Sequence, residues 1–136
     1  SKGLVGSEMC IRDRIRDVDQ MSIKEIGSAL RKTSRLCRDL KIDKKEFFGG
    51  SMTISSLGGI GGTFFTPIIN PPEVAILGVG KSFDRLVKVK DKFVSRKILP
   101  ISLSYDHRII DGAEGARFCV YLGKCLGKDF AFKLAV

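Results

Sequence analysis

Apolar residues recur at helical spacing in the first part of the chain, beginning just after Ser22. Ser22 and Glu25 form the S-x-x-E pattern of a capping box, in which each side chain satisfies a free backbone N–H at the start of a helix. One face then repeats in steps of three and four residues, while the basic residues lie mostly elsewhere. This pattern predicts an amphipathic helix packed on a sheet, with a face made by Ile23, Ile26, Leu30, Thr33, Cys37 and Leu40.

From residue 51 the pattern changes to a period of two, which is typical of β-strands. Met52 and Ile54 alternate with polar residues, and a continuous apolar run comes next that suits a central strand. Two later stretches flank Asp91 and Lys92, and this arrangement predicts a hairpin. The five expected strands span residues 52–55, 74–79, 85–90, 93–99 and 101–105.

Three further segments bear on function. Residues 56–72 form a long Gly- and Pro-rich loop with many apolar groups, and such a loop is usually functional or covered by a partner. Asp111 is the expected N-cap of a last helix over residues 112–126, with Glu114 three residues on. Residues 130–136 are unusually apolar for a terminus, so this tail is expected to dock on its own chain or a neighbouring one.

Composition and charge narrow the classes of function. The chain has 136 residues and a mass of 15.0 kDa, with 43% apolar and 29% charged residues, which fits one globular domain. No run of about 18 apolar residues occurs, so no membrane span is expected. Residues 1–14 show no clear period and look foreign to the rest of the chain, so we expect them to be non-native or disordered and without function.

The net charge of +9 raises the alternative of a nucleic-acid-binding module. No run of five or six basic residues occurs and Trp is absent, so a solvated basic surface is the simpler interpretation. The four cysteines form no C-x-x-C pair and His107 is the only histidine, so no metal site is expected. Free thiols in a reducing cytoplasm account for the cysteines most simply.

Two glycine-containing segments resemble phosphate-binding loops without matching them. Gly80, Lys81 and Ser82 follow an apolar strand, but Ala75 occupies the place of the first glycine of that loop. The glycines between residues 58 and 62 miss the G-x-G-x-x-G spacing, because its last place falls on Phe64. We therefore expect Gly58, Gly59, Gly61 and Gly62 to allow a tight loop with close backbone approach.

The most informative candidate chemistry lies in SYDHRIIDG at residues 104–112. A lone histidine is more often structural than catalytic, but a junction between a strand and a capped helix commonly carries a site. A neutral imidazole can accept a proton from a thiol or hydroxyl. No neighbouring Cys or Ser is an obvious nucleophile for His107 to activate, which favours a base acting on a substrate group. Asp111 has the alternative of a purely structural cap.

Two blocks of sequence resemble one known family. ISLSYDHRIIDGAEGARF at residues 101–118 is similar to the DHRxxDG signature of the 2-oxoacid dehydrogenase acyltransferases. GGSMTISSLGGIGGTFFTPIINPPEVAILGVGKS at residues 49–82 resembles a second block of that family, in the same order and separation. Within the family the likeness is greatest to the acetyl-transferring members of bacterial pyruvate dehydrogenase complexes. The resemblance covers residues 15–136 and identifies them with the C-terminal part of the catalytic domain.

The resemblance implies a reaction and roles for three residues. Family members move an acyl group, here an acetyl group, from a dihydrolipoyl thiol to coenzyme A. His107 would be the base that takes the proton of the attacking thiol, and Ser55 would donate a hydrogen bond to the oxyanion. Without the family, Ser55 would be an ordinary strand serine facing solvent. Asp111 would hold the junction and, through Arg108, the base.

The resemblance also implies a fold and partners. The fold is α/β, a mixed β-sheet covered by helices, similar to chloramphenicol acetyltransferase but here truncated. Homotrimers would assemble into a large core, with His107 from one subunit, Ser55 from its neighbour and residues 56–72 lining the channel. The lipoyl group, and the contacts to pyruvate dehydrogenase and dihydrolipoamide dehydrogenase subunits, would belong to domains missing from this chain. The residues that contact coenzyme A stay unknown, and no nucleic acid, membrane or metal is expected.

Three alternatives stay open. A sister specificity, for succinyl or branched-chain acyl groups, would be separated by the acyl preference of the enzyme. A non-catalytic, core-forming fragment would assemble without turnover, although the presence of both His107 and Ser55 argues against it. A basic nucleic-acid-binding module would show strong salt-dependent binding.

Overall fold

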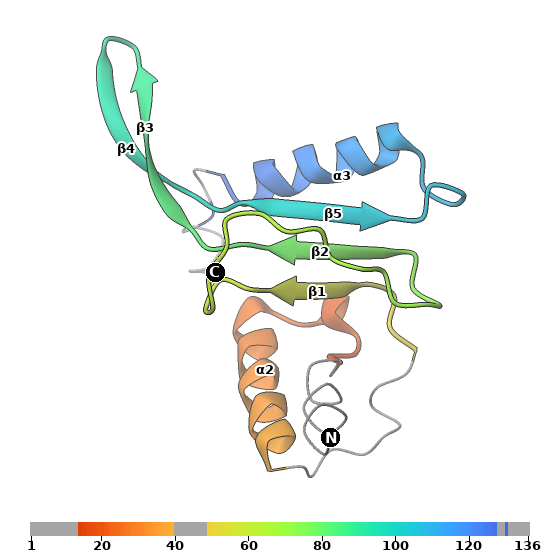
Figure 1. Ribbon diagram of the computed structural model, residues 1–136. Helices are drawn as coiled ribbons and strands as arrows, with labels where there is room; N and C mark the ends of the chain where they lie inside the picture. Colours follow the sequence, from red (N-terminus) through yellow and green to blue (C-terminus); the bar gives the residue numbers. More distant parts are fainter. Residues whose placement is uncertain (1–13, 40–48, 128–129, 131–136) are drawn as a thin grey trace, which may run out of the picture. The chain divides into compact units, whose positions relative to one another are not determined.

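The computed structural model describes residues 14–39, 49–127 and 130, and Figure 1 shows the order of the elements. The chain divides into two compact units, residues 1–50 with 131–136 and residues 51–130. The segments 1–13 and 131–136, on which the predictions of a non-native start and a docking tail fall, lie outside the described residues.

The first unit contains the short helix η1 (Val18–Gln20) and the helix α2 (Ile23–Arg38). The predicted capping box is present, because Glu25 N–H donates to Ser22 Oγ at 3.3 Å and Ser22 N–H donates to Glu25 Oε2 at 2.7 Å. The predicted apolar face is only partly covered: Cys37 is buried, whereas Ile23 and Leu30 are about half exposed. The start of this helix follows from local signals, and its packing does not.

The second unit is organised around a three-stranded sheet. Its strands are β1 (Thr53–Ser56), β2 (Ala75–Val79) and β5 (Ile101–Tyr105), in the order β1-β2-β5. β1 runs parallel to β2 and β5 runs antiparallel to it, so the sheet is mixed, as expected. β2 is central and carries the buried residues Ala75, Ile76 and Leu77, which fits its continuous apolar sequence.

The register divides the side chains between the two faces of this sheet. Ser55 pairs with Gly78, which pairs with Ser102, so these three residues share one face. Tyr105 pairs with Ala75, an odd number of residues from Gly78, and lies on the opposite face. Ser55 is half-buried while the apolar Ile54 is 67% exposed, so the alternation of β1 does not turn its serine fully to solvent.

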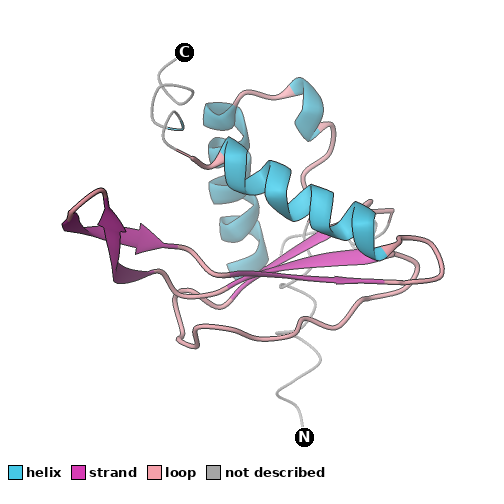
Figure 2. Ribbon diagram, turned by 90° about the horizontal axis from the view of Figure 1, so that it is seen from above, coloured by secondary structure: helices cyan, strands magenta, loops and turns pink. Residues whose placement is uncertain are grey.

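The loop after β1 covers one face of the sheet, and the helix α3 (Gly112–Cys125) covers the other (Figure 2). A Cβ built on Gly78 would lie 3.0 Å from Phe65 Cζ and 3.2 Å from Pro67, so the missing side chain lets the loop rest on β2. A Cβ on Gly80 would collide with the carbonyl oxygen of Thr63. Close backbone approach therefore explains the glycine at position 80.

The prediction of close backbone approach holds for only one of the four loop glycines, and Gly59 has neither an atom within 4 Å of an added Cβ nor a positive φ. A Cβ on Gly58 would lie 3.3 Å from the carbonyl oxygen of Gly80, so close approach holds there. Gly61 and Gly62 have φ angles of 141° and 88° and no atom within 4 Å of an added Cβ. The expectation of close approach is wrong for these two residues. Glycine is favoured at both positions because the backbone there has a positive φ, which other residues rarely adopt.

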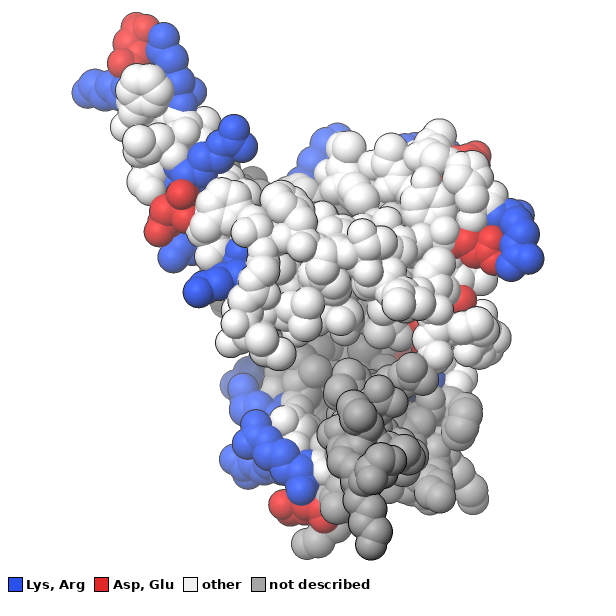
Figure 3. All heavy atoms as spheres, viewed as in Figure 1, with Lys and Arg blue, Asp and Glu red and all other residues white. Residues whose placement is uncertain are grey.

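The strands β3 (Phe83–Val89) and β4 (Lys92–Ile98) form the predicted hairpin, which projects from the sheet (Figure 1). Lys90 and Asp91 make the turn, and Lys90 takes it with a φ of 54°. Leu86 and Phe93 are 69% and 72% exposed. Figure 3 shows charged side chains along this hairpin and a broad uncharged area next to it. That contrast follows the sequence, since Glu73 is the only charged residue between positions 51 and 80.

Candidate active site

His107 lies on a tight turn directly after β5. The Asp106 N–H donates to the carbonyl oxygen of Val74 at 2.8 Å, which extends the pairing of β5 with the chain before β2. The N–H groups of Ile109 and Ile110 both donate to the carbonyl oxygen of Asp106, at 3.0 and 2.9 Å. This turn ends the strand and presents His107 at the surface, as the sequence predicted for a strand-to-helix junction.

Hydrogen bonds between Arg108 and the side chain of Asp106 stabilise this turn. Arg108 donates to the Asp106 carboxylate from its backbone N–H at 3.0 Å, from Nε at 2.9 Å and from Nη2 at 2.6 Å. These hydrogen bonds lower the pKa of Asp106 to about 2 and raise the pKa of Arg108. The expected link from Asp111 through Arg108 is wrong, because Asp106 both caps the turn and holds the guanidinium.

Asp111 has the structural role that the sequence allowed. Its Oδ1 accepts a hydrogen bond from the Glu114 N–H at 2.7 Å, which makes Asp111 the N-cap of α3. The helix then begins at Gly112, as predicted. Asp111 fixes the point where α3 begins, five residues beyond Asp106, so the two aspartates hold the two ends of the turn that carries His107.

Tyr105 is a neighbour of His107 that sequence reasoning missed. The two rings have centroids 5.7 Å apart and are tilted by 40°. A Cβ built on Gly115 of α3 would lie 2.9 Å from Tyr105 Cε1, so the tyrosine ring packs directly against the helix backbone. An aromatic residue two positions before His107, at the end of a strand, was the available signal.

Ser55 is not brought to His107 within one chain. Two strand spacings of about 4.8 Å and three residues of about 3.3 Å each separate the Cα atoms of Ser55 and Tyr105, which gives about 14 Å. Ser55 also lies on the loop-covered face, opposite to Tyr105. A side-chain hydrogen bond spans about 3 Å. A single chain therefore does not join these two residues in one site.

The loop that follows the Ser55 strand exposes several large apolar side chains. Ile60, Phe64 and Ile68 of the adjoining loop are 89%, 70% and 88% exposed. Thr53, two residues before Ser55, donates a hydrogen bond to the Glu73 carboxylate at 2.5 Å. Large exposed apolar groups of this kind mark contact surfaces.

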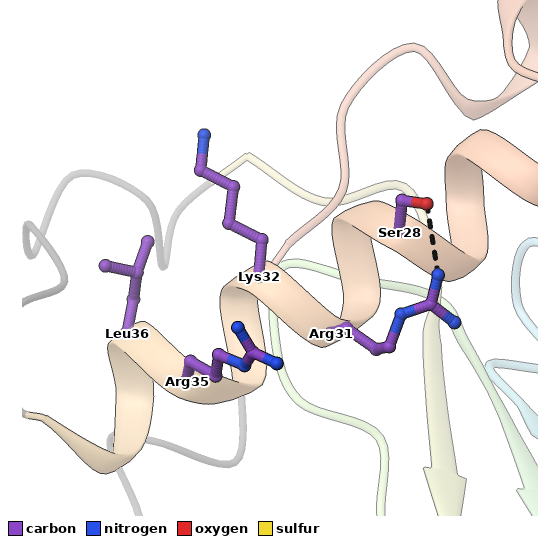
Figure 4. Close-up of a pocket in the computed structure, with 5 residues that line it drawn as sticks. All are labelled: Ser28, Arg31, Lys32, Arg35 and Leu36. Carbon is purple, nitrogen blue, oxygen red and sulfur yellow. Dashed lines mark hydrogen bonds between the residues drawn. The ribbon is translucent and has the colours of Figure 1, made fainter.

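The rest of the described chain contains no metal-holding cluster, and α2 carries an open hollow. The described His, Cys, Asp and Glu residues form no group that could hold a metal ion, and the described helices include none long and apolar enough to cross a membrane. An open hollow on α2 is lined by Ser28, Arg31, Lys32, Arg35 and Leu36, with Arg31 donating to Ser28 Oγ at 3.2 Å (Figure 4). This lining contains neither a carboxylate nor an imidazole, so it supplies no general base.

The curated relatives include acetyltransferase components of pyruvate dehydrogenase complexes and, at 43% identity, the succinyltransferase component of the 2-oxoglutarate dehydrogenase complex of Rickettsia typhi. The chain is 51% identical over 116 residues to the dihydrolipoyllysine-residue acetyltransferase component of the pyruvate dehydrogenase complex of Cupriavidus necator. The match covers 85% of this chain and 21% of the relative. The chain thus spans about a fifth of the length of this curated relative.

Two solved structures share the fold. One is the dihydrolipoamide acetyltransferase of Azotobacter vinelandii, with a TM-score of 0.82 and 47% identity, studied for the roles of a serine, a histidine and an asparagine in its catalytic mechanism. The other is the cubic core of the pyruvate dehydrogenase multienzyme complex, with a TM-score of 0.82 and 46% identity. Each match covers 88% of this chain and 49% of the solved chain.

These structures confirm the expected α/β fold, and this chain contains about half of the solved fold. A family model matches residues 13–131, which include the β1 strand, the loop after it and the whole β5–α3 junction. The chain belongs to the 2-oxoacid dehydrogenases acyltransferase family, to the part that forms its catalytic domain.

Proposed function

We propose that the protein of which this chain forms a part transfers an acetyl group from a dihydrolipoyl thiol to coenzyme A, with His107 as the general base. The observation that carries the proposal is the position of His107 on an exposed turn held by Asp106 and Asp111, within the family's signature segment. A base of this kind must be held firmly and yet reach a substrate thiol.

In the proposed reaction, His107 is the only group of the protein that accepts and returns a proton. The imidazole takes the proton of the coenzyme A thiol, and the thiolate forms a bond to the carbonyl carbon of the acetyl thioester. The resulting tetrahedral intermediate carries its negative charge on oxygen. Its collapse breaks the bond to the dihydrolipoyl sulfur, which receives the proton back from the imidazolium. General-base help of this kind contributes about 10²–10⁴ in rate.

We assign Ser55 the role of hydrogen-bond donor to the oxyanion, from a second copy of the chain. The register supports this assignment, because Ser55 and His107 of one chain lie on opposite faces and too far apart to share one reacting group. The exposed apolar residues of the loop beside Ser55 support a contact with another chain. Residues 56–72 would then line the channel between copies.

The spacing of the three residues gives separate support. The serine, histidine and asparagine studied in the Azotobacter enzyme are separated by 52 and 4 residues. Ser55, His107 and Asp111 have the same separations. The third position differs in kind, since this chain has an aspartate there. Both Asp and Asn are strong N-cap residues, so this difference is compatible with the capping role of Asp111.

The assembly and partners of the whole protein are part of the same proposal. The likeness to a cubic core supports homotrimers that join into a large core. The lipoyl group, and the contacts to pyruvate dehydrogenase and dihydrolipoamide dehydrogenase subunits, would come from segments of the relatives that this chain does not span. The free thiols of Cys119 and Cys125 suit the reducing cytoplasm in which we place this complex.

The test is acetyl transfer from acetyl-dihydrolipoamide to coenzyme A by the protein and by His107→Ala. We expect the variant to lose activity by about 10²–10⁴. Arg117→Ala, at an exposed position of α3, is the matched control and should keep full activity. Unchanged turnover in His107→Ala would overturn the assignment. Faster transfer of succinyl or branched-chain acyl groups would select a sister specificity, and assembly without any turnover would select a non-catalytic core component.

A further inference from the structure

The His107 ring is held without hydrogen bonds from the part of the chain that the structure describes. The imidazole lies at an exposed turn position, and within the described residues no hydrogen bond or ion pair reaches either of its nitrogens. A general base must present one nitrogen to the thiol in a narrow range of directions. The orientation of this ring therefore depends on packing, and the ring that contacts it is that of Tyr105.

Tyr105 is itself held by the helix that follows the turn. Three atoms of its ring lie within 3.5 Å of the place a Cβ on Gly115 would take, the nearest at 2.9 Å. Real Cβ atoms do not approach other atoms so closely, so any larger residue at position 115 would displace the tyrosine ring. Gly115 is also the buried residue of α3.

Gly112, one turn earlier on α3, adjoins both rings. A Cβ built on Gly112 would lie 3.8 Å from the Tyr105 hydroxyl oxygen and 3.9 Å from His107 Nε2. Residues three apart on a helix share a face, so Gly112 and Gly115 form a flat strip of backbone. The two rings meet over this strip, and the Asp111 cap fixes where the strip begins.

We propose that Tyr105 is a positioning residue that holds the imidazole of His107 over the first turn of α3. This inference rests on the proposed role of His107 as the base. The phenol ring packs between the Gly115 backbone and the imidazole, and this contact limits the rotation of the His107 side chain. The face of the ring performs this role, so phenylalanine replaces tyrosine at position 105 without loss.

The test reads the His107 ring directly, because His107 is the only histidine of the chain and its ring-proton NMR signals need no further assignment. Tyr105→Leu should move these signals toward those of free histidine, while methyl signals far from the junction stay in place. In the transfer assay kcat should fall about tenfold, with the KM for coenzyme A changing less than about twofold, because the base loses orientation and not binding. Tyr105→Phe should restore both values.

A pair of glycine variants on one helix provides the matched control. Gly115→Ala inserts a methyl group into the Tyr105 ring and should reproduce the effects of Tyr105→Leu. Gly123→Ala adds the same group where nothing lies within 4 Å, and should leave the His107 signals and kcat unchanged.

Unchanged His107 signals in both Tyr105→Leu and Gly115→Ala would overturn the positioning role, even where His107→Ala abolishes turnover. A Tyr105→Phe variant as impaired as Tyr105→Leu would also overturn it, because the hydroxyl and not the ring would then be responsible. If His107→Ala leaves turnover intact, the proposed function fails instead, and the NMR result still reports whether Tyr105 orients the ring.

Discussion

The β5–α3 junction and the β1 strand each carry one of the two residues assigned to the chemistry, and they are built in opposite ways. The junction around His107 is held by contacts from its own chain: the Asp106–Arg108 pair, the Asp111 cap and the packing of Tyr105 on Gly115. Ser55 has only the backbone ladder of a four-residue strand at the edge of the described sheet. One half of the proposed site is complete in a single chain, and the other half is not.

This difference shows which contacts determine the geometry around His107 and which determine the surroundings of Ser55. The turn is held by three side-chain contacts that all lie within about ten residues of one chain, so its geometry does not need contacts from another chain. An edge strand that contains the exposed Ile54 leaves polar backbone groups and apolar surface uncovered. In the proposed site, another copy of the chain would cover this strand, and Ser55 would act together with His107 of that copy.

Mixing two inactive variants tests this comparison with the largest expected effect. Ser55→Ala removes the proposed oxyanion donor and should lower turnover by about 10²–10³, and His107→Ala should lower it at least as far. When the two chains are co-expressed in equal amounts, a site that takes Ser55 from one copy and His107 from another is intact in about a quarter of cases. We therefore expect about a quarter of the wild-type rate, measured as acetyl transfer to coenzyme A.

The control replaces one partner by the double variant. Co-expression of Ser55→Ala with Ser55→Ala/His107→Ala contains no intact donor and should show no recovery. If the mixture of Ser55→Ala and His107→Ala also showed no recovery of turnover, in particles shown to contain both chains, one chain would supply both Ser55 and His107 to a site. The separation of Ser55 from His107 in the register would then not describe the working site.

The sequence predicted most elements, because their signals are local. Pro100 and the Asp111 cap bound the β5 strand and the start of α3, and both were placed correctly. The sheet is mixed with β2 at its centre, as the apolar run of that strand indicated. Such signals act within a few residues, so they can be recognised from the sequence alone.

The errors concern contacts that depend on how the elements meet. Alternation in β1 could not show that Ile54 would stay uncovered, because coverage depends on a second layer. Two carboxylates lie near Arg108 in sequence, and only the backbone turn reveals that Asp106 also accepts the Arg108 N–H. Tyr105 was missed because its contact with Gly115 requires α3 to fold back over β5.

Asp111 offers a prediction of intermediate size that sharpens the role of the junction. Asp111→Ala removes the acceptor for the Glu114 N–H and should lower the free energy of unfolding by about 1 kcal/mol. Asp111→Asn keeps a side-chain oxygen for the same bond and should be close to neutral. Urea unfolding of the three proteins, followed by circular dichroism, measures both values.

The matched comparison is with the other capped helix. Ser22→Ala removes the equivalent cap of α2 and should destabilise to a similar extent, but it should not reduce acetyl transfer. If Asp111→Ala affects stability and leaves the His107 ring signals and turnover at wild-type values, the cap serves the helix alone. The Asp111 cap would then not contribute to holding His107, contrary to our view of the junction.

The smallest expected effect is a dependence of stability on pH that comes from the Asp106–Arg108 pair. The guanidinium of Arg108 lowers the pKa of Asp106 to about 2, whereas an aspartate in an unfolded chain titrates near 3.9. A carboxyl whose pKa is lower in the folded state binds its proton more readily once the chain unfolds. Its stabilising contribution is therefore complete above about pH 4 and is lost as the pH falls toward about 2.

Asp106→Asn removes this titration, so thermal melts of the variant and the wild type should differ above about pH 4 and converge as the pH falls toward 2. The difference should be small and should shrink in high salt, because the side chain of Arg108 is 89% exposed to solvent. Melting curves that stay parallel across this range would mean that the pair forms no tighter contact in the folded protein than in the unfolded chain. The turn under His107 would then be held by its backbone hydrogen bonds and the Asp111 cap alone, and the junction would be less firmly built than its side chains indicate.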